Sequence, residues 1–429
     1  MIEKSELSEG QRDLLYIAGL VAVTYILFFL LGAIGGLRLN EIVGELQSIT
    51  FFAAAFAVIT LALNLHWGYT GMFNIGVAGF MAIGVYVMAI ATAPVDGDPA
   101  GLGLPIYIGV IAGMLAAGLA GALLAIPTLN VRADYFAIIT LGFAEIVRLS
   151  IESDTLRSFE VGGTTYGTGG SSGISYAAPN SVVDWIYNIE LNLLITEIPL
   201  GSQIQDTLYS AVELIGISTT MIDRLIYAFI VLLFALLIYL ILRRIAYSPL
   251  GRVLKAIRED EIVAKSLGKD TSRTKVKIFA LGSALMGLGG ILWIGRGSFI
   301  SPDSFMPIVT FYLFVALVIG GSGSNTGSVV GAFVFAAFLW QGPRYLRTIV
   351  QTNVDTDAPA TIYGAILELG SADIIPLLSY FAESLNELRW IVLGLVLILL
   401  MIYRPEGIFG DRKEIAAATD LSQRQRGDD

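Results

Sequence analysis

Residues 225–246 read LIYAFIVLLFALLIYLILRRIA, and residues 247–270 continue as YSPLGRVLKAIREDEIVAKSLGKD. The first stretch is uncharged up to Arg243, and as a helix rising about 1.5 Å per residue it would cross a hydrocarbon core of roughly 30 Å. The second stretch mixes both charge signs and therefore belongs in water. Together they predict a membrane-spanning helix that leads into a structured aqueous loop.

Nine further apolar runs approach or reach spanning length, at 14–34, 47–66, 74–93, 104–127, 134–151, 276–296, 308–321, 328–345 and 388–403. We therefore expect an all-α polytopic membrane protein with about ten transmembrane helices. The run 308–321 is short and needs tilt or burial against neighbouring helices. The run 14–34 is too long for the core of a cleavable signal and follows a start of mixed charge, so it predicts a retained anchor.

The composition agrees with this class and excludes several kinds of enzyme. Apolar residues make up 55% of the chain and charged residues 14%, whereas soluble proteins have about 45–50% and roughly a quarter. The absence of cysteine excludes disulfides, thiolate metal sites and a cysteine nucleophile. The single histidine, His66, leaves no basis for a histidine triad or metal cluster, so we expect no metal and interpret His66 as an interfacial hydrogen-bonding group.

The distribution of basic residues predicts the orientation. Ten of the 26 Lys and Arg residues fall between Arg243 and Lys277, and five more follow Tyr403. Because Lys and Arg in short loops favour the cytoplasmic side, both termini are predicted to face the cytoplasm. The predicted segments are a cytoplasmic N-terminus 1–13, helices one to five 14–151, an external segment 152–223, helix six 224–246, a cytoplasmic loop 247–275, helices seven to ten 276–403 and a cytoplasmic tail 404–429.

The external segment is strongly acidic. Residues 152–223 contain nine Asp and Glu residues against Arg157 alone, in a chain of net charge −10 and pI near 4.8. Because acidic surfaces stay hydrated at high ionic strength, this favours a salt-loving prokaryote such as a haloarchaeon. The alternative is an acidic external loop without environmental meaning. Such a charge gives no reason to expect a nucleic-acid partner.

Two apolar regions are interrupted by glycine, which in transporters is typical of broken helices that line a cavity. The first is NLHWGYTGMFNIGVAGF over 64–80 and the second is GGSGSNTG over 320–327. The alternative is a tight hairpin with closely packed helices, because small residues let transmembrane backbones approach. Asn64, Thr70 and Asn74 favour a functional role for the first region, since polar groups at membrane depth need partners.

Charges also occur within the run 134–151, where Glu145 and Arg148 stand three residues apart on one helical face. They fit either a pair facing the protein interior or an external interface with Arg148 extended toward water. The external glycine-rich stretch 161–174 has the composition of a phosphate-binding loop. It lacks a following lysine and a strand–helix context, so a nucleotide site there is not expected.

The loop 247–275 predicts two short amphipathic helices. Ser248 can cap the first, with Pro249 at its first position, and its apolar stripe is Leu250, Val253, Leu254 and Ile257. A second helix over 262–267 would end at Gly268 in a left-handed conformation. Such helices indicate a docking surface for a soluble partner, and the alternative is an interfacial helix held by anionic lipid.

Seven motifs occur in an order that resembles the branched-chain amino acid permeases of ATP-binding-cassette importers, specifically their M-type subunits. They are Asn64-Leu-x-x-Gly68-Tyr69-x-Gly71 with Gly76 and Phe80; Arg132-x-x-Tyr135-Phe136-Ala137-Ile138-x-Thr140-Leu141 with Glu145; Thr168-Gly169-Gly170-Ser171-Ser172-Gly173-Ile174; Gly251-Arg252-x-x-x-Ala256-Ile257-Arg258-Glu259-x-Glu261-x-x-Ala264-x-x-Leu267-Gly268; Ser301-Pro302-x-x-Phe305; Gly320-Gly321-x-Gly323-Ser324-x-x-Gly327; and Arg404-Pro405-Glu406-Gly407-Ile408-Phe409-Gly410. Two features depart from the pattern. The wider importer consensus EAA-x-x-x-G is matched only at Ala264 and Gly268, and the external segment 177–222 looks longer than usual.

The resemblance implies a transport subunit of the cell membrane that is not itself an enzyme. Its partners would be a second related permease, two cytoplasmic ATPases that bind ATP and magnesium, and an external solute-binding protein. The resemblance assigns candidate residues to four roles. The ATPase-coupling loop would use Arg252, Arg258, Glu261, Ala264 and Gly268, and the translocation path would use Asn64, Thr70, Asn74, Tyr135, Thr140 and Glu145. The glycines that pack or gate would be Gly68, Gly71, Gly76, Gly320, Gly321, Gly323 and Gly327, and the external loop would use Gly169, Gly170, Ser171 and Gly173.

Three alternatives stay open at the level of sequence. The same fold could import urea, short amides, sugars or nucleosides. An ion-driven secondary carrier would need intramembrane carboxylates, of which Glu145 is the obvious one. A membrane-embedded enzyme is disfavoured by the lack of cysteine and the single histidine.

Overall fold

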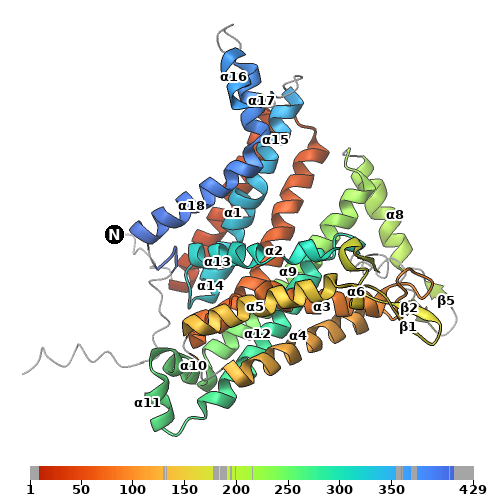
Figure 1. Ribbon diagram of the computed structural model, residues 1–429. Coiled ribbons are helices and arrows are strands. Elements are labelled where there is room, and N and C mark those ends of the chain that lie inside the picture. Colours follow the sequence, from red (N-terminus) through yellow and green to blue (C-terminus); the bar gives the residue numbers. More distant parts are fainter. Residues whose placement is uncertain are drawn as a thin grey trace, which may run out of the picture.

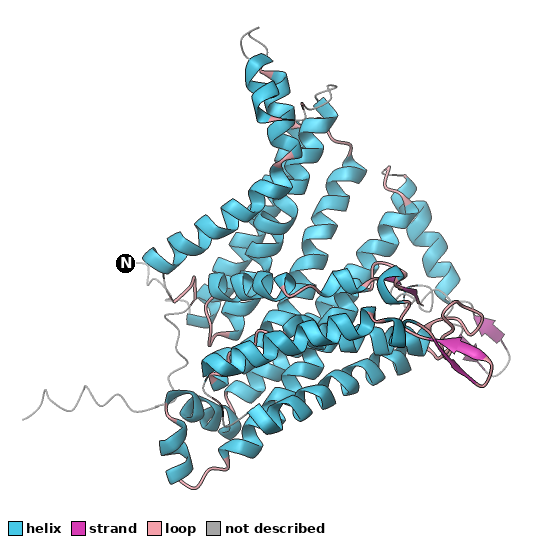
Figure 2. Cartoon of the chain, in the orientation of Figure 1, coloured by secondary structure: helices cyan, strands magenta, loops and turns pink. Residues whose placement is uncertain are grey.

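The computed structural model describes residues 9–128, 131, 133–176, 183, 191–193, 196–198, 200–214, 216–353, 359, 361–368, 374–404 and 406–409. Within them the chain is a bundle of long helices (Figure 1), with short strands gathered at one edge (Figure 2). Residues 1–8 of the predicted N-terminal segment and 410–429 of the predicted tail lie outside the described residues, as does Arg132 of the second motif.

Six described helical segments are long and apolar enough to cross a membrane. They are Leu15–Ile34 within α1 (Glu9–Ile34), α2 (Leu39–Thr70), α4 (Ile106–Thr128), α9 (Thr219–Ala246), α12 (Thr271–Ile294), and Pro302–Gly320, which joins η2 (Pro302–Phe305) to α13 (Ile308–Gly320). Two shorter apolar helices are α3 (Val77–Thr92) and Arg389–Leu400 within α18 (Leu385–Tyr403). The helical, polytopic class is confirmed, and the count of ten stays a prediction.

Two predicted runs are helical but depart from a simple span. The run 134–151 forms α5 (Ala133–Glu152), whose charges keep it outside the six. The run 328–345 is divided into α14 (Asn325–Val334), a π-helical turn η3 (Phe335–Gln341) and α15 (Gly342–Asn353). A π turn accommodates an extra residue in the helix, a feature that hydropathy does not report.

Helix α2 is the centre of the bundle, and it packs against α9, α12 and α14. It begins at Leu39, eight residues before the predicted run, because Glu41 and Gln47 lower the hydropathy without breaking the helix. The Glu41 carboxylate accepts a hydrogen bond from the Arg38 backbone N–H at 2.9 Å, which caps the first turn. The longer helix carries one more carboxylate, Glu45, into the bundle.

Glycine allows close contact between α3, α4 and α12. A Cβ added at Gly84 would lie 2.6 Å from Cα of Gly287, and one added at Gly287 would lie 2.7 Å from Cβ of Ala117. Backbone-to-backbone packing of this kind is typical of helices in lipid, where small residues take the place of a hydrophobic driving force.

The strands lie at the right of the bundle in Figure 1, and short helices lie beside them and at the top. Strands β1 (Phe159–Val161) and β2 (Thr164–Tyr166), β3 (Ile174–Ser175) and β6 (Phe299–Ile300), and β4 (Leu191–Leu193) and β5 (Thr196–Ile198) form three antiparallel pairs. The connecting helices are α6 (Asp154–Arg157), η1 (Gly170–Ser172), α8 (Leu200–Glu213), α16 (Ile362–Glu368) and α17 (Ile375–Glu383). Helices α10 (Pro249–Glu259) and α11 (Glu261–Ser266) lie at the opposite end from the β1–β2 hairpin (Figure 1).

Candidate functional site

The loop between α9 and α12 folds into two helices whose ends are set by side chains. Ser248 Oγ accepts a hydrogen bond from Gly251 N at 3.4 Å, which caps α10. Asp260 Oδ1 accepts from the backbone N–H groups of Ile262 and Val263 at 2.8 and 3.0 Å and caps α11. The chain leaves α11 through Gly268 at φ 78°, the left-handed conformation expected of this glycine.

Glu261 fastens α11 to α12. Its carboxylate pairs with Lys275 of α12, lies 3.2 Å from Lys265 Nζ, and accepts from Thr271 Oγ1 at 3.0 Å. Burial alone would raise the pKa of Glu261, but Lys275 leads the groups that bring this pKa below its usual value. The attraction is therefore present at neutral pH and is lost only when the pH falls through that lowered pKa.

The other candidates in this loop have different surroundings. Ala264 is only 1% exposed and lies on the buried side of α11. Arg252 of α10 is exposed to solvent. Arg258 extends from the last turn of α10 toward the end of α2, where its guanidinium donates to the carbonyl oxygen of Gly68. The loop therefore makes a direct polar contact with the bundle through Arg258.

Arg258 lies where the two glycine-interrupted regions meet. A Cβ added at Gly71 would lie 3.6 Å from Cγ of Arg258, and one added at Gly323 would lie 3.0 Å from its Nη1. Asn64 joins the two regions, because its Oδ1 accepts from Gly323 N at 2.7 Å and its Nδ2 donates to Asn325 Oδ1 at 3.2 Å. We call Asn64, Gly68, Arg258, Gly320 and Gly323 the glycine junction.

The glycines of the junction allow contact between backbones. A Cβ at Gly68 would overlap Asn64 Oδ1 and lie 2.6 Å from Gly323 N, and a Cβ at Gly327 would lie 2.6 Å from the Gly320 carbonyl oxygen. The packing interpretation of these glycines therefore describes the chain as it stands. Whether they also form a gate stays a prediction.

The last motif of the sequence closes the junction from another side. The backbone N–H groups of Ile408 and Phe409 donate to the carbonyl oxygens of Ile319 and Gly320 at 2.9 and 3.0 Å. Gly407 has φ 80°, and a Cβ there would lie 2.5 Å from Gly321 N. Four motifs far apart in the sequence thus converge at one end of the bundle.

The six path candidates do not share one surface. Asn64, Thr70, Asn74 and Thr140 are buried, with exposed fractions of 3% or less, whereas Tyr135 is 61% exposed. The Ile75 N–H donates to Thr140 Oγ1 at 3.0 Å, and a Cβ at Gly76 would lie 2.6 Å from the Thr140 carbonyl oxygen. These buried polar groups find their partners inside the chain, so a path lined by all six together stays a prediction.

Glu145 and Arg148 form a pair on the surface of α5. Arg148 Nη2 lies 2.6 Å from Glu145 Oε1 and its Nη1 lies 3.0 Å from Glu152, and the Arg148 side chain is 16% exposed. His66 was expected at an interface but is fully buried. Its Nε2 lies 3.1 Å from the Phe279 carbonyl oxygen, and its ring stacks on Phe279 with the centroids 4.4 Å apart.

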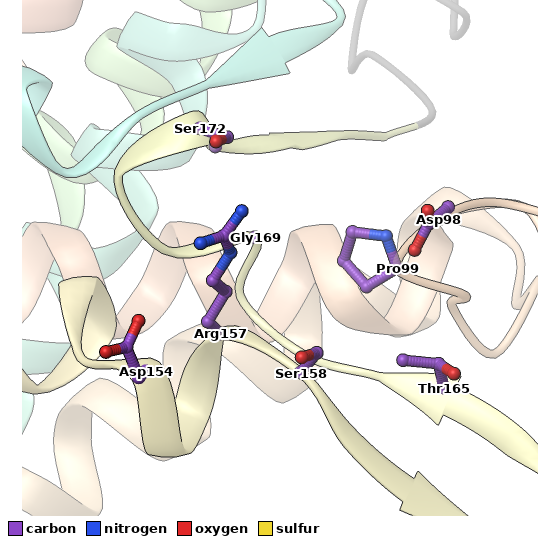
Figure 3. A pocket seen from close by; sticks show the side chains of 9 residues that line it. Asp98, Pro99, Asp154, Arg157, Ser158, Thr165, Gly169 and Ser172 are labelled. Carbon is purple, nitrogen blue, oxygen red and sulfur yellow. The ribbon is translucent and has the colours of Figure 1, made fainter.

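Two of the glycine-rich candidates, Gly169 and Gly173, line a pocket of about 570 Å³ at the strand-bearing end. Gly169, Gly170 and Gly173 have φ between 57° and 75°, and Ser171 is exposed at the tip of the turn. Figure 3 shows the Arg157 side chain directed into this pocket, with Asp154 on one side and Asp98 on the other. The pocket therefore presents both charge signs, from α6 and from the connection that contains Asp98.

Among the residues that the sequence interpretation missed, Glu45 and Arg296 matter most. Both are half-buried, at the end of the bundle away from the glycine junction. The signal that could have identified Glu45 is its position within a continuous helix that starts before the hydropathy rises. Glu45 is therefore a carboxylate within one of the six candidate spans, which Glu145 of α5 is not.

The junction yields a prediction about stability. Replacement of Asn64 by leucine (Asn64→Leu) leaves the Gly323 N–H and the Asn325 amide oxygen buried without their partner, which costs about 1–3 kcal/mol for each group. We expect a lower thermal unfolding midpoint of the detergent-solubilised protein. Asn40→Leu is the control, because Asn40 accepts from Ser218 N at an exposed position where water can replace it. Equal midpoints for the two variants would contradict the role of Asn64.

Residues 46–401 match the family described as "Branched-chain amino acid transport system / permease component". The chain is similar to the high-affinity branched-chain amino acid transport system permease protein LivM of Escherichia coli (strain K12), with 31% identity over 354 residues that cover 82% of this chain and 67% of that protein. A probable branched-chain amino acid transport permease protein LivM of Methanocaldococcus jannaschii is 22% identical over 395 residues, 86% of this chain and 94% of that protein.

A second kind of relative matches a shorter part of the chain. The high-affinity branched-chain amino acid transport system permease protein LivH of Salmonella typhimurium is 32% identical over 105 residues, which cover 24% of this chain and 33% of that protein. No solved structure matches the chain.

Proposed function

This chain belongs to the family of permease components of branched-chain amino acid transport systems, and we propose that it supplies one half of the path through an ATP-driven importer. It is a multi-pass permease of the cell membrane, and a permease of this family has neither catalytic activity nor a cofactor of its own. The resemblance drawn from the seven motifs is confirmed. A salt-loving source stays a prediction, since the comparisons do not support it.

We propose ten spans with both termini in the cytoplasm. Two sets of contacts at opposite ends of the bundle support this. At the end that carries the strands, Asn353 Nδ2 donates to the Gly35 carbonyl oxygen at 2.7 Å and Ala100 N to that of Thr165 at 2.8 Å. At the other end lie the glycine junction, α10 and the residues after α18. A chain that alternates between these two ends would make ten crossings, and we propose that the basic loop lies inside.

The observation that carries the coupling role is the contact between Arg258 and Gly68. It connects a water-exposed helix pair directly to the end of α2, the most buried of the candidate spans. A force applied to α10 by a cytoplasmic ATPase would therefore reach the helices that pack around α2. Glu261 and Ala264 hold α11 on α12, so both helices of the loop would move together.

We infer the partners from the two kinds of relative. A related permease would pair with this chain, because part of the sequence also matches LivH proteins. Two cytoplasmic ATPases would bind ATP and magnesium and engage the exposed side of α10, which includes Arg252. An external solute-binding protein would dock at the strand-bearing end, where the pocket around Arg157 offers groups of both charge signs.

Leucine, isoleucine and valine are the proposed cargo, following the names of the relatives. Selectivity should reside mainly in the external binding protein, so exchanging that protein should change the cargo. If cargo stays the same after the exchange, selectivity lies in the permeases. Import of urea, short amides, sugars or nucleosides is the alternative that this exchange also tests.

The direct test uses the complete importer in proteoliposomes. We expect [14C]leucine uptake that requires this chain, the second permease, both ATPases, the binding protein and ATP on the ATPase side. Uptake by this chain alone, driven by an ion gradient with no nucleotide present, would show that the chain is a secondary carrier.

The coupling loop gives a sharper prediction. Combining Glu261→Lys with Gly268→Pro removes the pairing with Lys275 and blocks the left-handed turn after α11, since proline cannot adopt positive φ. We expect uptake to be abolished while the protein still inserts into the membrane. Glu383→Lys, a charge reversal at an exposed position of α17, is the control and should leave uptake unchanged. Normal uptake by the double variant would show that coupling does not depend on α11.

A further inference from the structure

A second group of polar residues lies in the outer half of the bundle, far from the glycine junction. Glu45 is in the second turn of α2, Arg296 follows the end of α12, and Gln341 ends the π-helical turn η3. Gln341 Nε2 donates to Glu45 Oε1 at 3.2 Å, so three elements meet at this point. We call Glu45, Gln47, Arg296 and Gln341 the outer polar cluster.

Arg296 is positioned by aromatic rings and keeps donors available. Its guanidinium carbon lies 4.8 Å from the ring centroid of Phe51 and 5.6 Å from that of Phe52. Its Nη2 reaches Gln47 Oε1 and Ser48 Oγ only at 3.4 and 3.5 Å, which are long hydrogen bonds. A guanidinium held by its faces in this way presents its edge, the part that binds a carboxylate through two parallel bonds.

The two opposite charges of the cluster act on one another but do not pair. Arg296 and Arg344 both act electrostatically on Glu45, yet no N–O contact within 4.0 Å joins Glu45 to Arg296. Gln341 is 4% exposed, and its Oε1 has no hydrogen-bond partner among the residues that the structure describes. Charges in a spanning segment are expensive and normally pair, so these opposite charges without a direct contact leave hydrogen-bonding capacity for a ligand that carries both signs.

An apolar surface adjoins the charged groups. Phe52, one of the rings beside Arg296, lies with its centroid 5.9 Å from that of Trp340, and both side chains are only partly buried. Trp340 and Gln341 are the last two residues of the π-helical turn, so the aromatic surface and the amide come from one element. A short aliphatic side chain would be removed from water on these rings.

We propose that the outer polar cluster binds the zwitterionic head of an amino acid during passage, with the α-carboxylate on Arg296 and the α-ammonium on Glu45. The aliphatic side chain would lie on Phe52 and Trp340, and the spare oxygen of Gln341 would accept from the ammonium group. Arg224 and Arg344 also act electrostatically on Arg296, so the surroundings favour the carboxylate end of the ligand. This inference rests on the proposed function and adds a site within the permease that recognises the cargo.

The test separates passage from energy supply. In the complete importer with saturating leucine-loaded binding protein, we expect Arg296→Gln to lower [14C]leucine uptake by roughly tenfold or more, with binding-protein-stimulated ATP hydrolysis kept within about twofold. Arg296→Lys keeps the positive charge but lacks the two parallel N–H donors of a guanidinium, so it should lose less uptake than Arg296→Gln. Glu45→Gln should also lower uptake per ATP. Arg243→Gln is the matched control. Arg243 is exposed in the last turn of α9, and this variant should behave as the unaltered protein.

The outcomes are distinguishable. Unaltered uptake per ATP in Arg296→Gln overturns the site. Loss of co-purification of Arg296→Gln with the second permease also overturns it, because the cluster is then an interface between subunits. If the unaltered importer itself takes up no amino acid, the proposed function fails and not this inference alone. If it takes up only uncharged solutes, the assignment of a zwitterion fails while the permease function stands.

Discussion

Replacement of Arg258 by glutamate (Arg258→Glu) is expected to reduce leucine uptake per ATP by roughly tenfold to hundredfold. The guanidinium donates to the Gly68 carbonyl oxygen, and it lies beside Gly71 and Gly323, one from each glycine-interrupted region. A carboxylate cannot donate to that carbonyl, and it would place a negative charge at the carbonyl end of α2, where the helix dipole disfavours it. The ATPases would then move α10 without moving the bundle.

The measurement is the ratio of leucine taken up to ATP hydrolysed in proteoliposomes that contain the complete importer. Arg258→Lys should give an intermediate ratio because a single ammonium can still donate to Gly68. Arg243→Glu changes an exposed arginine of α9 by the same charge and should leave the ratio unaltered. A normal ratio for Arg258→Glu would show that coupling does not pass through this contact.

The largest effect on folding is expected from replacement of Gly331 by leucine (Gly331→Leu). A Cβ at this position of α14 would overlap the Ala316 carbonyl oxygen and lie 2.6 Å from Gly320 N. Both are backbone atoms of α13, so no side chain can move aside and the two helices must separate. Overpacking of a core costs about 1–3 kcal/mol, and we expect at least the upper end of that range here.

The check is the yield of monodisperse protein and its thermal unfolding midpoint in detergent. Gly394→Leu is the matched control, because Gly394 is also within a helix, α18, and a Cβ there meets nothing within 4 Å. Leucine has the better helix propensity, so the control should be as stable as the unaltered chain or slightly more stable. Similar midpoints for both variants would contradict the close packing of α13 on α14.

Hydropathy predicted the helical class well, because a spanning helix depends on a local property, the length of an apolar run. Each of the ten predicted runs is largely helical, and the short one at 308–321 forms α13 as expected. The loop helices were also predictable, since Ser248, Pro249 and Gly268 act on their own neighbours in the sequence. The start of α2 and the π-helical turn were not, because a few polar residues or one extra residue barely change an averaged hydropathy.

The candidate site was predictable as a set of residues but not as an arrangement. Glycine and asparagine marked both interrupted regions, yet the bond from Gly323 N to Asn64 Oδ1 joins positions 259 residues apart, which no local pattern reports. For the same reason Arg258 could be assigned to a coupling loop, while its contact with Gly68 could not be foreseen. The path stays a prediction, and the roles that Asn74 and Thr140 have in the fold could not be foreseen: they accept from the backbone N–H groups of Gly76 and Ile75, just before α3.

The backbone bonds from Ile408 and Phe409 to Ile319 and Gly320 have a consequence for biosynthesis. The ribosome makes α13 well before residues 408 and 409. Until those residues are made, the carbonyl groups of Ile319 and Gly320 lack their final hydrogen-bond donors. The face of the permease that carries the glycine junction can therefore be completed only after residues 408 and 409 have been made. A nascent chain arrested before residue 408 would be inserted in the bilayer but would remain unfinished on that face.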